Sequence, residues 1–239
     1  MKIIYISTLT SKSKMNKIIE NAKSKPLQSI QKFHRLMCEG FVKNNVSVKT
    51  ISSIPMSRKI SEKILWLDKC EEENGVKYTY IPFINIKVLR QICTFLGTIV
   101  KVTKEVLNNK KEKIFICDIL NTTISTTTLI LSKIFKFQCW AIVTDLPRDM
   151  QKNKKINEKM QTKYDGYILI TEEMNKIVNP KNKPHIVIEG LVDIRESAEN
   201  NEVQKSSPRV IMYAGGLYER YGVKTLIEAF GNIQNNNVK

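Results

Sequence analysis

The chain alternates short apolar runs with longer segments of helical period, and this alternation constrains its fold more than any other feature. Helical spacing of apolar residues occurs at 30–41 and 86–107, between runs of strand length. Strands separated by helices are typical of βαβ units, whose parallel strands are buried on both faces. The sequence therefore predicts an α/β fold with a doubly wound, mostly parallel, Rossmann-like sheet. The predicted strands are 2–6, 46–51, 77–83, 113–120, 138–144, 167–170 and 185–188.

The pattern changes near Ile194, which sets the predicted domain boundary. Residues 1–193 are expected to form one domain, and the polar stretch 194–207, which lacks apolar periodicity, is expected to be a linker. The segment 208–239 reads as one strand, a glycine turn and one helix. A single βα unit buries too little surface to form a core, so we expect it to be the first unit of a second, incomplete domain.

Charge is the second strong feature, because the 39 Lys and Arg exceed the 23 Asp and Glu and give a net charge of +16. Such a surplus attracts nucleic acid, anionic lipid or phosphorylated small molecules, or it belongs to a solvated surface. A basic helix predicted at 149–163 fits contact with anionic lipid or a pyrophosphate-bearing acceptor. Nucleic acid is not expected, because the aromatic residues lie in apolar runs rather than between the basic ones.

Cysteine and histidine usage argues against a metal site. Five cysteines are scattered singly and there are two histidines, so neither a zinc site nor a disulfide framework is expected. Free cysteines fit a reducing compartment, so a cytoplasmic location is expected. No apolar stretch reaches the roughly 20 residues that span a bilayer. We therefore expect a protein that is soluble or peripheral on the inner face of the cell membrane.

Two local patterns carry candidate chemistry. Gly215-Gly216 follows a predicted strand and precedes a helix, so backbone amides could approach a diphosphate there, with Arg220 adding a charged contact. Thr144-Asp145 ends a predicted buried strand, at the sheet edge where ligands of α/β folds bind. The Asp145 carboxylate could accept a proton or orient a hydroxyl there, or it could cap the next helix.

The segment 210–230, read with 185–193, carries a family resemblance. Val-Ile-Met-Tyr-Ala-Gly-Gly-Leu-Tyr-Glu-Arg-Tyr-Gly-Val-Lys-Thr-Leu-Ile-Glu-Ala-Phe resembles the opening of the donor domain in retaining glycosyltransferases of family four, which have the GT-B fold. His-Ile-Val-Ile-Glu-Gly-Leu-Val-Asp is similar to the end of the acceptor domain in that family. Residues 74–83 resemble members that act on cell-surface polysaccharides.

The resemblance implies transfer of a sugar from a nucleotide-sugar donor to an acceptor hydroxyl, with neither cofactor nor metal. Asp145 would be catalytic, Gly215, Gly216 and Arg220 would bind the donor diphosphate, and Thr8 and Thr144 would face the acceptor-side cleft. A lipid-linked acceptor, an anionic membrane surface and a second chain carrying the donor domain are the further partners it suggests.

This sequence departs from the family pattern at several positions. Gly216 and Tyr221 stand where the family often has Arg and Lys, and Thr144 stands where it has His. The first loop, 7–10, lacks the family's glycines, and the paired glutamates of the donor site would lie beyond residue 239. The alternative hypothesis is therefore a non-catalytic module that binds an acceptor or an anion and needs a partner chain; the chain alone is expected to transfer no sugar.

Overall fold

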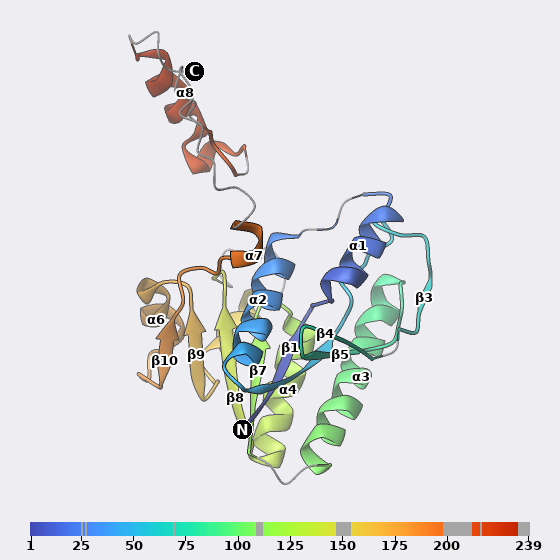
Figure 1. Ribbon diagram of the computed structural model, residues 1–239. Helices are drawn as coiled ribbons and strands as arrows, with labels where there is room; N and C mark the ends of the chain where they lie inside the picture. The colour runs from blue at the N-terminus through green and yellow to red at the C-terminus, as the bar shows by residue number, and fades with distance from the viewer. Residues whose placement is uncertain are drawn as a thin grey trace. The chain divides into compact units, whose positions relative to one another are not determined.

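The computed structural model describes residues 1–24, 26, 28–68, 70–108, 112–146, 154–197, 212–215 and 217–233. The chain divides into two compact units, Met1–Val192 and Asp193–Lys239 (Figure 1). The first unit contains the sheet and most of the helices.

The first unit is built on an eight-stranded sheet with the order β10-β9-β8-β7-β1-β2-β5-β4 (Figure 1). All neighbouring strands are parallel except β4, which runs antiparallel to β5. This confirms the predicted α/β class. The strands are β1 (Lys2–Ser7), β2 (Ser47–Ser52), β4 (Glu71–Glu73), β5 (Val76–Tyr80), β7 (Lys113–Asp118), β8 (Gln138–Val143), β9 (Gly166–Leu169) and β10 (His185–Val187).

The strand order reverses beside β1. From β1 the chain builds outward through β2 and β5, and it then returns to the other side of β1 and builds through β7, β8, β9 and β10. Connections on either side of such a reversal leave in opposite directions, which opens a crevice at the carboxyl ends of the strands. The sheet therefore has a natural ligand site between β1 and β7.

Helices cover both faces of the sheet, and alternate strand residues show which face each helix covers. Ile4 and Ile6 of β1 belong to a core cluster with α3 (Lys87–Leu107) and α4 (Thr122–Phe135). Ile3 and Tyr5 belong to a second cluster with α1 (Lys12–Glu20) and α2 (Ser29–Lys43). Successive side chains of a strand point to opposite faces, so the unit has three layers.

Two further helices of the first unit correspond to a basic helix predicted at 149–163 and a short helix that the sequence predicts to start at Thr171. The structure describes α5 as Lys154–Gln161, within the predicted basic helix, and α6 as Glu172–Val178. Each contributes to the cluster that contains α3 and α4, through Met160 and Val178 respectively.

Helix α1 was not predicted, because its sequence is mostly polar and its stability comes from capping. The Ser11 side chain accepts a hydrogen bond from the backbone N–H of Lys14 at 3.0 Å. The Glu73 carboxylate of β4 accepts from the backbone N–H groups of Lys12 and Ser13, at 2.6 and 3.1 Å. A carboxylate at a helix N-terminus is favourable, so Glu73 of β4 stabilises the start of α1. The strand β4 was not predicted either.

The prediction of one strand over 77–83 was wrong in its second half. The strand β5 ends at Tyr80, and Phe83–Ile84 forms a separate strand, β6, which pairs with β3 (Leu65–Trp66). Pro82 interrupts the run, since proline has no backbone N–H to donate to a neighbouring strand.

The second unit contains α7 (Ile194–Ser197), a 3₁₀ turn at Glu219–Tyr221 and α8 (Val223–Gly231). The predicted linker therefore begins with a helical turn. Residues 209–211 lie outside the described part of the chain, and Met212–Ala214 forms no strand, contrary to prediction. Met212 is 83% exposed, and a strand without a neighbour leaves its backbone groups unpaired.

Candidate functional site

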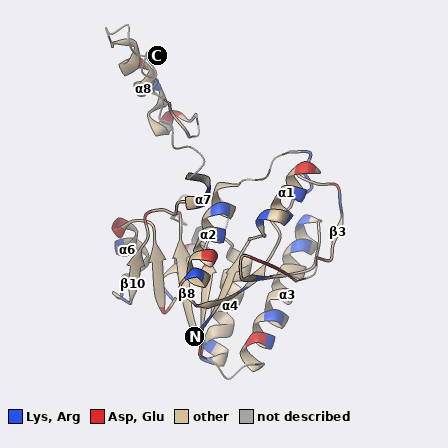
Figure 2. Ribbon diagram, viewed as in Figure 1, with Lys and Arg blue, Asp and Glu red and all other residues tan. Residues whose placement is uncertain are grey.

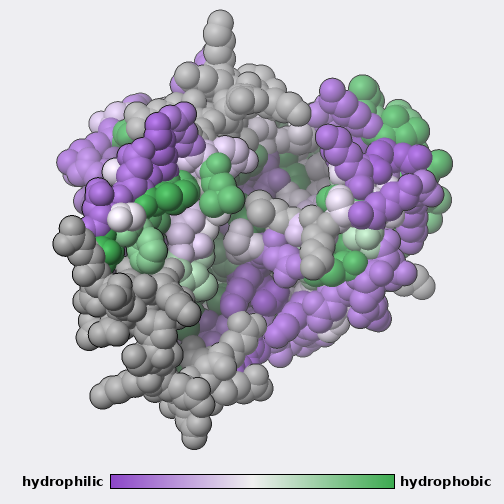
Figure 3. Space-filling model, turned by 90° about the horizontal axis from the view of Figure 1, so that it is seen from above, coloured by the Kyte–Doolittle hydropathy of each residue, from purple (hydrophilic) through white to green (hydrophobic). Residues whose placement is uncertain are grey.

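A cavity of about 420 Å³ lies at the carboxyl edge of the parallel strands, where the strand order reverses. Figure 3 looks onto this edge of the first unit, where many of the visible side chains are hydrophilic. The cavity is lined by Thr8 after β1, 53–57 and Ile60 after β2, Arg90, Gln91 and Thr94 on α3, and 120–124 around the start of α4.

The cavity lining combines polar with apolar side chains and is almost uncharged. Its hydroxyl groups include those of Thr8, Ser53 and Thr123, its amides are Gln91 and Asn121, and Arg90 carries its charge. Hydroxyl and amide groups donate and accept hydrogen bonds in equal measure. The site therefore suits a ligand rich in hydroxyl groups, and the N-terminus of α4 together with Arg90 favours partial negative charge.

The loop after β1 is held in place from two sides. On α2, the buried Gln31 donates through Nε2 to the Thr8 carbonyl and accepts at Oε1 from the Thr10 N–H at 3.1 Å. On the other side, the Thr8 hydroxyl donates to Asn121 Oδ1. These bonds fix the position of Thr8 at the cavity wall.

Asp118, the last residue of β7, positions Asn121. Its carboxylate is 1% exposed and accepts from Asn121 Nδ2 at 2.6 Å, from the Leu120 N–H at 3.0 Å and from the Ser7 hydroxyl at 3.2 Å. Because a buried carboxylate is stable only when its oxygens are hydrogen-bonded, Asp118 ties the ends of β1 and β7 to the start of α4.

A buried histidine completes this network below the cavity. His34 on α2 places Nε2 3.2 Å from Asp118 Oδ2, close enough for an ion pair although not aligned as a hydrogen bond. Its Nδ1 lies 2.5 Å from the Tyr5 hydroxyl. Burial, with the nearby groups of Cys38 and Asp118, raises the pKa of Tyr5 well above its usual value, so its hydroxyl stays protonated beside Nδ1.

Arg90 closes the side of the cavity formed by α3. Its Nη1 donates to the Met56 carbonyl in the loop after β2. A guanidinium has five N–H donors in a fixed planar arrangement. The bond to Met56 therefore orients the group, and the side chain has further donors with which to bind a ligand.

The structure places the predicted acceptor-side residues at one edge of the sheet. Thr8 lines the cavity, whereas Thr144 and Asp145, which follow β8, are not among its lining residues. In the sheet Asp118 is level with Ile142, so Asp145 lies three residues further out, about 10 Å along the strand direction. Asp145 is exposed and accepts from the Leu146 N–H at 2.9 Å. The Thr144 hydroxyl is buried without a hydrogen-bond partner.

The predicted donor-side residues belong to the second unit. Gly215 is described, and a Cβ there would lie 2.6 Å from the Tyr213 hydroxyl oxygen. Gly216 lies outside the described residues, and the Arg220 backbone is in the 3₁₀ turn, although its side chain is outside the described part.

Asp118, Asn121 and Arg90 were not predicted from the sequence. A signal was available for two of them, because Asp118 is the one carboxylate within the predicted strand 113–120 and Asn121 follows that strand directly. Arg90 had no such signal, since its position on the exposed or the cavity side of α3 depends on how that helix packs.

Neither a metal-binding cluster nor a spanning helix is found in the described part of the chain. No three His, Cys, Asp or Glu side chains there could jointly hold a metal ion. Likewise, none of the described helices has the length and apolar character needed to cross a membrane.

Comparison with solved structures identifies proteins of the same architecture. A sucrose-phosphate synthase from Thermosynechococcus elongatus matches all of this chain at 13% identity, with a TM-score of 0.53. The apo structure of OtsA also matches all of it, at 8% identity and a TM-score of 0.52. The chain shares the fold of GT-B glycosyltransferases. It spans 61% and 64% of the length of these two chains. No family model and no curated protein matches the sequence.

Proposed function

We propose that this chain is the acceptor-side part of a glycosyltransferase, which transfers a sugar from a nucleotide-sugar donor to an acceptor hydroxyl. The observation that carries the proposal is a hydroxyl-rich cavity at the strand-order reversal of a sheet that shares the GT-B fold. Fold alone does not specify function, so the argument depends on the residues that line the cavity.

The cavity is the proposed acceptor site. Thr8, Asn121 and Thr123 line it, and the buried Asp118 holds Asn121 in place. Sugars present several hydroxyl groups that act as both donors and acceptors, and such ligands require fixed partners of both kinds. The chain of contacts from Asp118 to Asn121 to Thr8 supplies partners that are positioned before the ligand arrives.

Asp145 and Thr144 are proposed to act at the outer end of this site. Both follow β8, the strand next to β7, at the same edge of the sheet as the cavity. Asp145 is exposed there, so a ligand that extends beyond the cavity along this edge would meet a carboxylate able to orient its hydroxyl.

The segment 208–239 is proposed to be the first βα unit of a donor-side domain, with Gly215, Gly216 and Arg220 at the donor diphosphate. Helix α8 supports this, because none of its residues is buried and Leu226, Ile227 and Phe230 are exposed. An amphipathic helix gains its stability by packing its apolar face. Further chain, either in the same polypeptide or in a partner, would cover that face.

A role in cell-surface polysaccharide synthesis is the finer part of the proposal. It would give the enzyme a lipid-linked acceptor at the inner face of the cell membrane. The net charge of +16 supports a site near anionic headgroups, because such a surplus attracts phosphate-bearing surfaces.

Sugar binding by the cavity tests the proposal. The purified chain is titrated with a panel of simple glycosides, and binding is followed by saturation-transfer NMR. Asn121→Ala should weaken the affinity of the best ligand about tenfold, since one or two lost hydrogen bonds are worth about 1.4 kcal/mol. Thr123→Val, which keeps the side-chain shape and removes one hydroxyl, should weaken it by a smaller factor.

Asn16→Ala is the matched control, because Asn16 is exposed on α1 and does not line the cavity. Circular dichroism establishes that each variant is folded. Absence of binding to every glycoside by the folded wild-type chain would contradict the proposal. Equal affinities for the wild type, Asn121→Ala and Thr123→Val would contradict it too.

A further inference from the structure

Helix α3 turns its apolar stripe away from the protein. The face that it buries consists of Thr94, Thr98, Val102 and Glu105. A Cβ added at Gly97 would lie 2.4 Å from Ile81 Cγ2, so the helix lies very close to the layer beneath it. Small residues permit this approach. Val102 is buried and Ile99 and Val106 pack against the core, whereas the other large apolar side chains of α3 are exposed.

The outward stripe is long and continuous. Helical spacing places its members on one side of α3, since residues three and four apart are neighbours on a helix. Leu96 is 54% exposed and Val100 is 65% exposed. The other exposed members of this α3 stripe are Val88, Leu89, Ile92, Phe95 and Leu107.

Helix α4 packs beside α3 on the same face of the sheet and extends this surface. Its residues Ile130 and Ile134, one turn apart, are also exposed. Isolated exposed apolar residues are normal, but a contiguous patch of this kind marks a surface that binds something.

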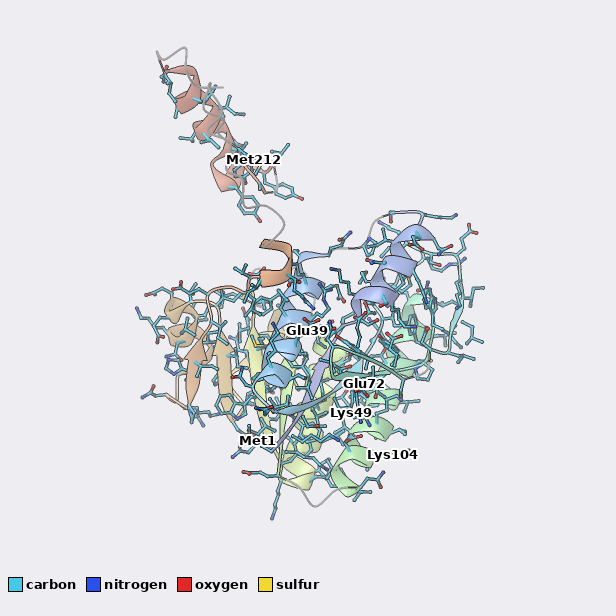
Figure 4. The ribbon with its side chains drawn as sticks, in the orientation of Figure 1. Met1, Glu39, Lys49, Glu72, Lys104 and Met212 are labelled. Carbon is cyan, nitrogen blue, oxygen red and sulfur yellow. The ribbon has the colours of Figure 1, made fainter. Side chains whose placement is uncertain are left out.

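The charges around the α3 stripe indicate what it binds. Lys87 and Lys104 are exposed at the two ends of α3. Lys104, labelled in Figure 4, is one turn from Val100, and Figure 2 shows several basic residues along α3. The one acidic residue of α3, Glu105, is buried and paired with Lys2 at 2.9 Å and with Lys49. Helix α4 has no acidic residue in its sequence. The exposed surface of both helices is therefore apolar and basic, which complements an anionic lipid surface.

We propose that the outer face of α3 and α4 binds an anionic lipid bilayer, with the α3 stripe inserted among the lipids and its lysines at the headgroups. Membrane binding would also bring the chain to acceptors that are carried on lipids. This last point rests on the proposed function, whereas membrane binding itself does not.

Vesicle binding tests the proposal. The full chain is mixed with vesicles of phosphatidylcholine alone or with about one-third phosphatidylglycerol, and the bound fraction is measured by flotation. Anionic vesicles should bind it, and neutral vesicles should bind it much more weakly. Leu96→Glu should lower the partition coefficient at least about tenfold. It replaces an apolar side chain that would be inserted among the lipids with a negative charge, which the anionic lipid repels.

Leu67→Glu is the matched control, since Leu67 is 63% exposed outside this face. It should bind like the wild type. Lys104→Ala should lower binding to anionic vesicles and leave binding to neutral vesicles unchanged, with Lys181→Ala, an exposed lysine outside α3 and α4, as its control. In a separate variant, Phe95→Trp should show fluorescence that brominated lipids quench.

Three outcomes would overturn the proposal: absence of binding to anionic vesicles, equal binding by Leu96→Glu and Leu67→Glu, or a lipid-free dimer that Leu96→Glu dissociates. The last would assign the face to a second copy of the chain. Since no sugar is present in the vesicle assay, its failure leaves the proposed transferase intact. Loss of the expected glycoside binding likewise leaves the membrane proposal intact.

Discussion

Replacement of Asp118 by alanine should destabilise the protein more than replacement of any exposed carboxylate at the same sheet edge. The change removes the acceptor for Asn121 Nδ2, the Leu120 N–H and the Ser7 hydroxyl. It also leaves His34, whose Nε2 lies 3.2 Å from the carboxylate, facing a void. All these groups surround a side chain that is 1% exposed.

The magnitude follows from those contacts. Hydrogen bonds to a charged group contribute about 1.5–3 kcal/mol each, but bonds that share one carboxylate are not additive. Breaking a buried charged contact costs about 3–5 kcal/mol, so we expect a loss of about 4 kcal/mol. With a urea dependence of about 2–3 kcal/mol per molar, the unfolding midpoint should fall by about 1.3–2 M.

The assay is urea unfolding at pH 7 followed by far-ultraviolet circular dichroism. Asp145→Ala is the matched control, because Asp145 ends the adjacent strand but is exposed, and it should change the free energy of unfolding by less than about 0.5 kcal/mol. Asp118→Asn retains one acceptor oxygen, so its loss in free energy of unfolding should lie between those of Asp118→Ala and Asp145→Ala. This variant provides the measurement if Asp118→Ala does not fold. A loss below about 1 kcal/mol for Asp118→Ala, or one equal to that of Asp145→Ala, would refute the reasoning.

Two further predictions concern stability. Gly166→Ala should lower the free energy of unfolding, measured in urea, by about 1–3 kcal/mol, because the added Cβ would lie 2.6 Å from ring atoms of Trp140. Gly190→Ala, where a Cβ meets no atom within 4 Å, should be neutral, and equal effects would rule out the steric explanation. Burial acts to raise the pKa of Glu105. Hydrogen bonds from Lys49 and Lys2, together with the positive charges of these lysines, lower that pKa below its usual value. The stability that the Glu105 carboxylate contributes is therefore fully present above its pKa in the unfolded chain, about 4.3. It is lost as the pH falls through the lower pKa of Glu105 in the folded protein. Thermal unfolding of Glu105→Gln should accordingly depend less on pH between pH 7 and 3 than that of the wild type, and parallel pH profiles would contradict this.

Most of the sheet could be predicted from the sequence. A strand such as Lys113–Asp118 is buried on both faces, so its residues form a continuous apolar run that is visible without any structure. The helices α2 and α3 likewise begin and end close to where their apolar spacing begins and ends. In these segments local pattern and tertiary burial agree.

The elements that were missed depend on partners distant in sequence. Helix α1 needs the carboxylate of Glu73, which is 60 residues or more away, and β4 needs the turn at Asn74-Gly75. Both turn residues have positive φ, 51° and 76°, as a tight hairpin between right-twisted strands requires. Neither the cap nor the pairing leaves a periodic signal in the chain.

By itself, then, the sequence determined the α/β class, the alternation of strands and helices, and the carboxyl ends of strands as the place for polar side chains. The tertiary structure decided which of those side chains meet. Ser7, His34 and Asp118 come together because parallel pairing aligns the ends of β1 and β7 under α2. It also decided which side of α3 is buried, because periodicity shows that a helix has an apolar face and close packing against small residues turned that face outward.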